Sequence, residues 1–269
     1  MSLKLDCLAI AAHPDDAEIS CGGILLLLSA AGRRVGVLDL TRGEMGTRGT
    51  AAERDAEARE ASERLGLAYR GNLELPDGRV EVALGAREAI ARVLRETRPA
   101  TLLAHAPQDA HPDHAAAGRL ALEAFYVSGL KRLAELDGGP PAARPRALFH
   151  FLSHEPFDPT LVVDITSVYE RKVEVVRAYA SQLRPSGPAD RGEHFLRGAD
   201  ILDAAANEHE RDGAGAFPRR AHERDARNGA QPVECVGEQP VLVGGDIGHA
   251  DGREIIDRRP EPDRRRSPG

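Results

Sequence analysis

Up to about residue 180, short apolar runs alternate along the chain with longer stretches of helical periodicity. Residues 7–12 (CLAIAA) form an unbroken apolar run, which is typical of a strand buried on both faces. A polar turn at 13–16 leads into a helical stretch that Gly32 can end as a C-cap. Further strands are expected at 35–40, 69–73, 101–104, 147–152 and 161–164, and further helices at 51–65, 83–98, 115–126 and 167–180. These repeated units predict an α/β fold, a Rossmann-like and mostly parallel sheet with helices on both faces in a three-layer sandwich.

The pattern ends near residue 205. Between residues 207 and 269 the only aromatic residue is Phe217 and the only leucine is Leu242, while Arg, Pro and Gly are abundant. Such a segment buries too little apolar surface to offset the entropy lost on ordering. We therefore expect a folded domain at 1–205 and a polar tail at 206–269 that is disordered or loosely packed.

Composition and charge exclude several classes of protein. A net charge of −7 and a pI near 5.8 argue against a nucleic-acid partner. No apolar run approaches the roughly 20 residues that span a bilayer, and the N-terminus lacks a signal peptide's apolar region. Cys7, Cys21 and Cys235 have no paired spacing, so we expect no disulfide framework, and Cys7 and Cys21 should be buried. These features predict a cytoplasmic protein without a membrane partner.

Two clusters of histidine and aspartate each follow a predicted strand, AHPDD at 12–16 and HPDH at 111–114. Loops after parallel strands open at the same edge of a sheet, so the two clusters can meet in one crevice. A catalytic zinc ion takes three ligands from His, Asp or Glu and keeps one position open for water. The set that the clusters can supply is His13, Asp16 and His114.

The other polar residues of the clusters suggest catalytic roles. Asp15 remains free beside the ion, where a general base is required. His111 could face the substrate carbonyl and stabilise the oxyanion, and Asp113 could orient the imidazole of His111. For either cluster alone, ordinary loop chemistry is the alternative, because proline fixes turns and aspartate caps helices. The two clusters together favour metal binding.

Two alternatives come from other functional classes. A nucleotide-binding module would fit the first strand–helix turn, which Gly22 and Gly23 follow. The chain has no GxGxxG motif there, and Asp15 and Asp16 would repel a phosphate. A metal-binding protein without catalysis is the other alternative.

The AHPDD and HPDH motifs, complete at 12–16 and 111–114, resemble the hallmark of the PIG-L or LmbE family of zinc-dependent N-acetylglucosaminide deacetylases. The resemblance covers residues 5–205 and implies a deacetylase domain there. It implies a small GlcNAc-conjugate substrate, a Zn²⁺ cofactor with Fe²⁺ as the alternative, and a homo-oligomer, since relatives commonly form trimers or hexamers.

The same resemblance implies a role for each motif residue. It assigns the metal ligands to His13, Asp16 and His114, in agreement with the ligand chemistry. It also makes Asp15 the base, and it makes His111 the residue that assists the oxyanion and the leaving amine.

Two further segments are similar to the bacillithiol-biosynthesis (BshB-type) branch of the family, residues 39–50 (DLTRGEMGTRGT) and 179–182 (YASQ). That branch deacetylates N-acetylglucosaminyl malate, whose carboxylates match the fork of an arginine. The implied arginine is Arg54, with Arg48 as a weaker candidate, and Gln182 could contact sugar hydroxyls. The alternative for Arg48 is a solvated loop charge, that for Arg54 is a helix-surface charge, and that for Gln182 is an ordinary polar group at a helix end. Other GlcNAc-conjugate deacetylases, chito-oligosaccharide deacetylases and mycothiol-type amidases are the alternatives within the enzyme class.

Overall fold

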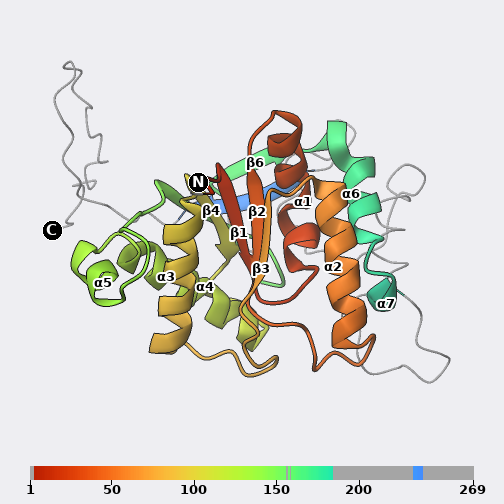
Figure 1. The fold of residues 1–269 in the computed structure, drawn as a ribbon. Helices are drawn as coiled ribbons and strands as arrows, with labels where there is room; N and C mark the ends of the chain where they lie inside the picture. The colour runs from red at the N-terminus through yellow and green to blue at the C-terminus, as the bar shows by residue number, and fades with distance from the viewer. Residues whose placement is uncertain (1–2, 156, 158, 184–232, 239–269) are drawn as a thin grey trace, which may run out of the picture. The chain divides into compact units, whose positions relative to one another are not determined.

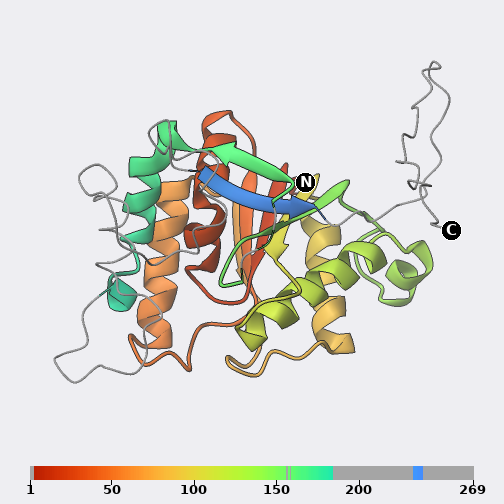
Figure 2. The same cartoon turned by 180° about the vertical axis from the view of Figure 1, so that it is seen from behind.

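A computed structural model describes residues 3–155, 157, 159–183 and 233–238 of the chain. The chain divides into a unit of residues 1–239, which contains all the described residues, and residues 240–269, which lie outside them. The described part is built on a seven-stranded sheet of order β3-β2-β1-β4-β5-β7-β6 (Figures 1 and 2). Its parallel strands are β1 (Cys7–Ala11), β2 (Val35–Asp39), β3 (Tyr69–Asn72), β4 (Thr101–His105) and β5 (Ala147–Phe151).

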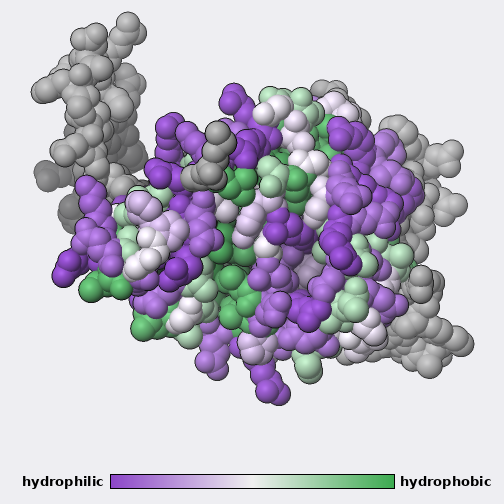
Figure 3. Space-filling model, in the orientation of Figure 1, coloured by the Kyte–Doolittle hydropathy of each residue, from purple (hydrophilic) through white to green (hydrophobic). Residues whose placement is uncertain are grey.

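Helices cover both faces of this sheet, which confirms the predicted α/β architecture. One face carries α1 (Asp16–Ala30), α2 (Ala51–Leu65) and α6 (Tyr169–Val176), and the other carries α3 (Leu84–Thr97) and α4 (Pro112–Val127) (Figure 1). No helix in the described part is long and apolar enough to cross a membrane. The side of the surface shown in Figure 3 is largely hydrophilic, with small apolar areas near α3 and α5.

The central strands are buried on both faces, as their unbroken apolar sequences predict. In β1, Cys7, Ala9 and Ala11 pack into the core beneath α1 and α2, whereas Leu8 and Ile10 belong to the core beneath α3 and α4. Successive side chains of a strand point to opposite faces, so one apolar run contributes to two cores. The prediction that Cys7 and Cys21 are buried is also confirmed.

Local signals set the ends of α2. The Thr50 hydroxyl accepts a hydrogen bond from the Glu53 N–H at 3.2 Å, and the Glu53 carboxylate accepts one from the Thr50 N–H at 2.7 Å. This capping box satisfies two N–H groups that would otherwise lack partners at the start of the helix. Gly66 ends the helix in the left-handed conformation, with φ of 69°. This helix therefore lies where the sequence predicts it.

Three parts of the fold differ from the sequence-based expectation. A short helix, α5 (Lys131–Leu136), has no counterpart in the prediction. The helix expected at 167–180 is broken into a 3₁₀ turn (Thr166–Val168), α6 and α7 (Ala180–Leu183). Asp164 fixes that turn, because its carboxylate accepts hydrogen bonds from the N–H and the hydroxyl of Thr166.

The third difference lies in the tail. The sheet ends with β6 (Leu161–Asp164) and β7 (Val233–Glu238), and β7 pairs antiparallel with both β5 and β6. Strand β7 has no counterpart in the prediction, because its six residues (VECVGE) contain only three apolar side chains and lie in a segment that is polar on average. The rest of that tail lies outside the described residues.

A glycine sets the distance between α4 and the end of β4. A Cβ atom on Gly118 would lie 2.6 Å from the His105 carbonyl oxygen and 2.8 Å from the carbonyl of Ala106. These are backbone atoms, which cannot rotate away. We predict that Gly118→Ala lowers the free energy of unfolding by about 1–3 kcal/mol, seen as a lower urea midpoint.

Gly85→Ala in α3 is the matched control. A Cβ there would meet no heavy atom of the described chain within 4 Å. Replacing an exposed helical glycine by alanine should stabilise the protein by up to about 1 kcal/mol. Equal destabilisation by both substitutions would contradict the packing argument.

Candidate metal centre

The two polar clusters lie at the same edge of the sheet. Residues 12–16 join β1 to α1, and residues 111–114 follow β4 and begin α4. Strand β1 pairs directly with β4, in parallel. The carboxyl ends of these neighbouring strands therefore bring together loops that lie far apart in the sequence.

His13, Asp16 and His114 meet at this edge. Each offers one ligand atom, and these atoms lie within 4.8 Å of one another. Asp16 faces both imidazoles, with Oδ2 at 3.2 Å from His13 Nδ1 and Oδ1 at 3.3 Å from His114 Nε2. Two imidazoles and one carboxylate are a typical ligand set for catalytic zinc. The three residues therefore fit a single divalent cation.

The electrostatics of the three residues agree with a cation site. Burial lowers the pKa of His13, but Asp16, Asp113 and Asp77 outweigh it and raise that pKa to about 12. Burial likewise lowers the pKa of His114, and Asp16 with other carboxylate contacts raises it to about 9. Burial raises the pKa of Asp16, yet the neighbouring histidines hold it well below its usual value. The surrounding carboxylates thus favour positive charge at the centre.

Carboxylates also face the second nitrogen of each ligand imidazole. His114 Nδ1 lies 3.4 Å from Asp109 Oδ1. His13 Nε2 lies 3.0 Å from Asp77 Oδ1 and 3.3 Å from Asp113 Oδ2. Metal-binding histidines commonly use this arrangement, because the carboxylate fixes the ring and increases its basicity. Sequence reasoning missed Asp109 and Asp77, since Asp77 in a Pro-Asp-Gly sequence is typical of a simple turn.

Asp113 contacts a different imidazole from the one predicted. Its carboxylate accepts hydrogen bonds from the backbone N–H groups of Gly78 at 2.7 Å and Val80 at 3.1 Å, and it faces His13. Its backbone N–H donates to His111 Nδ1 at 3.2 Å, and one ligand atom from each of the side chains of His13, His111 and Asp113 lies within 4.8 Å of the others. The hydrogen-bonding partner of the carboxylate is thus His13, and the predicted orienting role toward His111 stays a prediction.

His105 is a further buried histidine that sequence reasoning missed. Burial lowers its pKa to about 4, so it is neutral. Its ring stacks on His114 with centroids 4.0 Å apart, and its Nε2 lies 3.2 Å from both the Ala12 nitrogen and Asp16 Oδ2. Its Nδ1 lies 2.9 Å from Ser153 Oγ, so both ring nitrogens already have protein partners, and a further possible ligand group, His105 with Asp109 and His114, fits a cation less well.

His111 and Asp15 lie beside the ligand set. The His111 ring centroid is 5.0 Å from that of His13 and 4.6 Å from that of His114. Burial and the charges of these two rings lower the pKa of His111. Burial raises the pKa of Asp15 to about 7, against an opposing effect of Arg54. A buried carboxyl group that titrates near neutral pH suits a general base.

The three predicted substrate residues have protein partners. Arg54 is buried and contacts the Asp15 carboxylate at 3.1 Å, so it does not lie on the helix surface. Arg48 Nη1 donates to the Gln182 carbonyl at 3.1 Å, and Gln182 Nε2 donates to the Arg48 carbonyl at 2.8 Å. The structure thus joins Arg48 to Gln182, and the burial of Arg54 contradicts the alternative of a helix-surface charge, while its substrate-binding role stays a prediction.

The segment 179–182 is joined to the first half of the chain by further hydrogen bonds. The Tyr179 hydroxyl donates to Glu18 Oε1 at 2.9 Å, and the Ser181 N–H and hydroxyl both donate to Glu57 at 2.7 Å. Together with the Arg48–Gln182 pair, these contacts place the segment against the loop at 41–50 and against α2.

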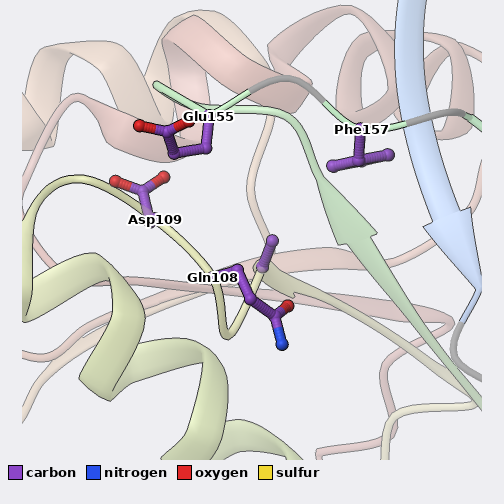
Figure 4. A pocket seen from close by; sticks show the side chains of 5 residues that line it. Gln108, Asp109, Glu155 and Phe157 are labelled. Carbon is purple, nitrogen blue, oxygen red and sulfur yellow. The ribbon is translucent and has the colours of Figure 1, made fainter.

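A cavity of about 430 Å³ adjoins the centre. Asp109 belongs to both, because its carboxylate contacts His114 and also lies in the cavity wall. In Figure 4, Glu155 lies on the same side of the cavity as Asp109, and Phe157 lies on the opposite side. The full lining consists of Ala106, Gln108, Asp109, Glu155 and Phe157. Its mixture of polar and apolar groups suits a small polar ligand.

We predict that Asp109→Asn weakens metal binding about 10- to 100-fold, because the neutral amide orients His114 less firmly. Competition between the protein and a chelating indicator would measure the affinity. Glu123→Gln is the control, since it removes a carboxylate near the far end of α4, the helix that carries His114, and should leave the affinity unchanged. Wild-type affinity in Asp109→Asn would contradict the orienting role.

Comparison with known proteins identifies relatives of this chain by sequence and by fold. The sequence profile of the PIG-L family, described as GlcNAc-PI de-N-acetylase, matches residues 8–125. Diacetylchitobiose deacetylase of Thermococcus kodakarensis is 32% identical over 202 residues, covering 71% of this chain and 74% of its own. 4-Oxalmesaconate hydratase of Pseudomonas putida is 28% identical over 195 residues, covering 65% and 73%. The crystal structure of a conserved protein from Thermus thermophilus superposes with a TM-score of 0.70 at 34% identity, covering 91% of this chain and all of its own.

Proposed function

This chain belongs to the PIG-L family, and we propose that it hydrolyses the acetamide of an N-acetylglucosamine-containing small molecule. Acetate and a free amine would be the products. The observation that carries the proposal is the Asp16 carboxylate between two imidazoles, with the carboxylate of the preceding residue, Asp15, held by Arg54. A ligand set with an adjacent base is what amide hydrolysis requires.

His13, Asp16 and His114 would hold the cofactor, which we propose to be Zn²⁺, with Fe²⁺ as the alternative. When bound, the cation would supply Lewis-acid polarisation of the acetyl carbonyl and would acidify a water molecule. Asp109 and Asp113 keep the two imidazoles oriented toward it through their second nitrogens.

The protein's own residues would carry the protons. Asp15 takes the proton of the attacking water, and its pKa near 7 lets it accept that proton at neutral pH. The ring centroids of His111 and His13 are 5.0 Å apart, so the His111 ring lies beside the proposed metal ligands. It stabilises the oxyanion of the tetrahedral intermediate, and either His111 or the protonated Asp15 passes a proton to the leaving amine.

For the aglycone, we propose malate, which would place the enzyme in bacillithiol biosynthesis. Two segments that resemble that branch, residues 39–50 and 179–182, support this proposal. They contact each other through the reciprocal hydrogen bonds of Arg48 and Gln182. Arg48 is half-buried, whereas Arg54 is buried, so Arg48 is the better placed of the two arginines to reach a carboxylate. Another GlcNAc conjugate or a chito-oligosaccharide is the alternative substrate.

All the candidate site residues lie within residues 1–205, where we propose the deacetylase domain. We further propose that this domain acts in the cytoplasm as a homotrimer or homohexamer. Light scattering of the purified protein would measure the assembly, and a monomeric mass would contradict it.

The experiment that tests the function is acetate release from purified protein. N-acetylglucosaminyl malate, diacetylchitobiose and N-acetylglucosamine would be compared, each with and without a chelator. Chelator-sensitive release of acetate supports the proposal, and the preferred compound identifies the aglycone. A hydratase is among the proteins similar in sequence to this chain, so addition of water to an unsaturated acid without any acetate release would overturn the proposal.

We predict that Asp15→Asn lowers kcat by at least about 100-fold while bound metal is retained, because general-base catalysis is typically worth 10²–10⁴-fold. Asparagine keeps a side-chain oxygen that can accept the hydrogen bond from Arg54, so the loop geometry should persist. Metal analysis beside acetate kinetics separates the two effects. His13→Ala, in contrast, should lose metal and activity together, and loss of metal from Asp15→Asn would refute the base assignment.

A further inference from the structure

We propose that Arg54 is a positioning residue that holds Asp15 in a strained backbone conformation beside the metal centre. The inference rests on the proposed function, in which Asp15 accepts the proton of the attacking water. It replaces the substrate-binding role that the family resemblance implies for Arg54.

The backbone of Asp15 needs such support. Its φ is 109° and its ψ is −31°. The other non-glycine residues with positive φ in the described part, Glu74 at 53° and Arg98 at 46°, lie close to the ordinary left-handed region. Asp15 lies well outside that region, where a side chain clashes with its own backbone. Such a conformation persists only when surrounding contacts enforce it.

Arg54 supplies these contacts from α2. Its Nη2 donates to the Pro14 carbonyl at 2.5 Å and to Asp15 Oδ2 at 3.1 Å, so one nitrogen binds both the peptide group before the strained residue and the carboxylate of that residue. Its Nη1 donates to the Gly43 carbonyl at 3.2 Å, which anchors the guanidinium to the neighbouring loop. A planar, rigid donor group fixes the relative positions of its acceptors in a way that a single ammonium cannot.

Gly43 allows this close approach. Its φ is +67°, and a Cβ atom there would lie 2.0 Å from Arg54 Nη1 and 2.5 Å from Cζ. Any other residue would therefore displace the guanidinium. Gly43 and Arg54 form a single unit, which connects the loop at 41–50 to the AHPDD loop.

The burial of Arg54 argues against direct substrate contact. Only 6% of its side chain is exposed, and both terminal nitrogens already donate to protein acceptors. A substrate carboxylate would have to displace these hydrogen bonds. We therefore expect Arg54 to affect turnover through Asp15 and to leave substrate affinity unchanged.

The test is steady-state kinetics of Arg54→Met, with Arg59→Met on the exposed side of the same helix as the matched control. We expect kcat of Arg54→Met to fall about 100-fold, as for a misplaced catalytic group, with KM and metal content unchanged. Arg59→Met should resemble the wild type. A raised KM with wild-type kcat would show that Arg54 binds substrate, and would overturn the proposal, as would wild-type values of both constants.

Chemical rescue distinguishes positioning from a general loss of structure. Added guanidinium ion should restore part of kcat in Arg54→Ala, whereas Asp15→Asn should not respond. Arg54→Lys keeps the charge but loses the planar fork, so it should remain impaired. Full activity in Arg54→Lys would contradict the requirement for a fork.

A second variant covers the case in which Arg54 substitutions fail to fold. Gly43→Ala should reproduce the fall in kcat, because it displaces the guanidinium while the side chains of the site residues and of Arg54 are chemically unchanged. In the Arg54→Ala background, the same change should cost much less. Additive effects of the two substitutions would show that Gly43 and Arg54 do not act together.

Hydrogen–deuterium exchange provides a readout that needs no activity. Amides of residues 13–19 should exchange faster in Arg54→Met than in the wild type and in Arg59→Met. If the wild type releases acetate but exchange and kcat are unaltered in Arg54→Met, the positioning role fails and the proposed function stands. If the wild type releases no acetate from any substrate, the proposed function fails, and the exchange result alone decides whether Arg54 holds the loop.

Discussion

The Asp16 carboxylate faces His13 with one oxygen and His114 with the other, and the rest of the site depends on this contact. It joins a loop after β1 to a loop after β4, which the parallel pairing of these strands brings side by side. Buried charges of this kind are unfavourable unless they are paired. A cation between the three side chains would satisfy all of them at once.

The carboxylates around this contact differ in their partners. Asp109 and Asp113 face the outer nitrogens of the ligand imidazoles, while backbone N–H groups or further histidines hold these carboxylates in place. Asp15 differs from them, because its partner is the buried Arg54. One set of carboxylates therefore contacts the candidate metal ligands, whereas the carboxylate of Asp15 is paired with an arginine.

Much of the fold can be predicted from the sequence, because apolar runs and helical periodicity report burial directly. Strand β7 could not be predicted this way, since six residues in a long polar tail barely change its average composition. The candidate metal ligands lie in two recognisable motifs. His105 lies within an apolar strand and Asp77 within a sequence typical of a turn, and neither local pattern indicates a site. Only the tertiary structure shows that His105 contacts Asp16 and that Asp77 contacts His13.

The burial of Arg54 shows a further limit of sequence reasoning. Its position on a charged helix suggests either a surface residue or a substrate ligand, and both interpretations assume an exposed side chain. Its partners, Pro14, Asp15 and Gly43, are distant in the sequence, and no local pattern identifies them.

The pairing of β1 with β4 also bears on how the protein matures. His13 and Asp113 are separated by 100 residues, and only the assembled sheet brings their loops together. A nascent chain that ends before β4 carries just two of the three candidate ligands, His13 and Asp16. A cation held by all three residues would therefore bind only after the central strands have paired, and its binding would stabilise a fold built on non-local contacts.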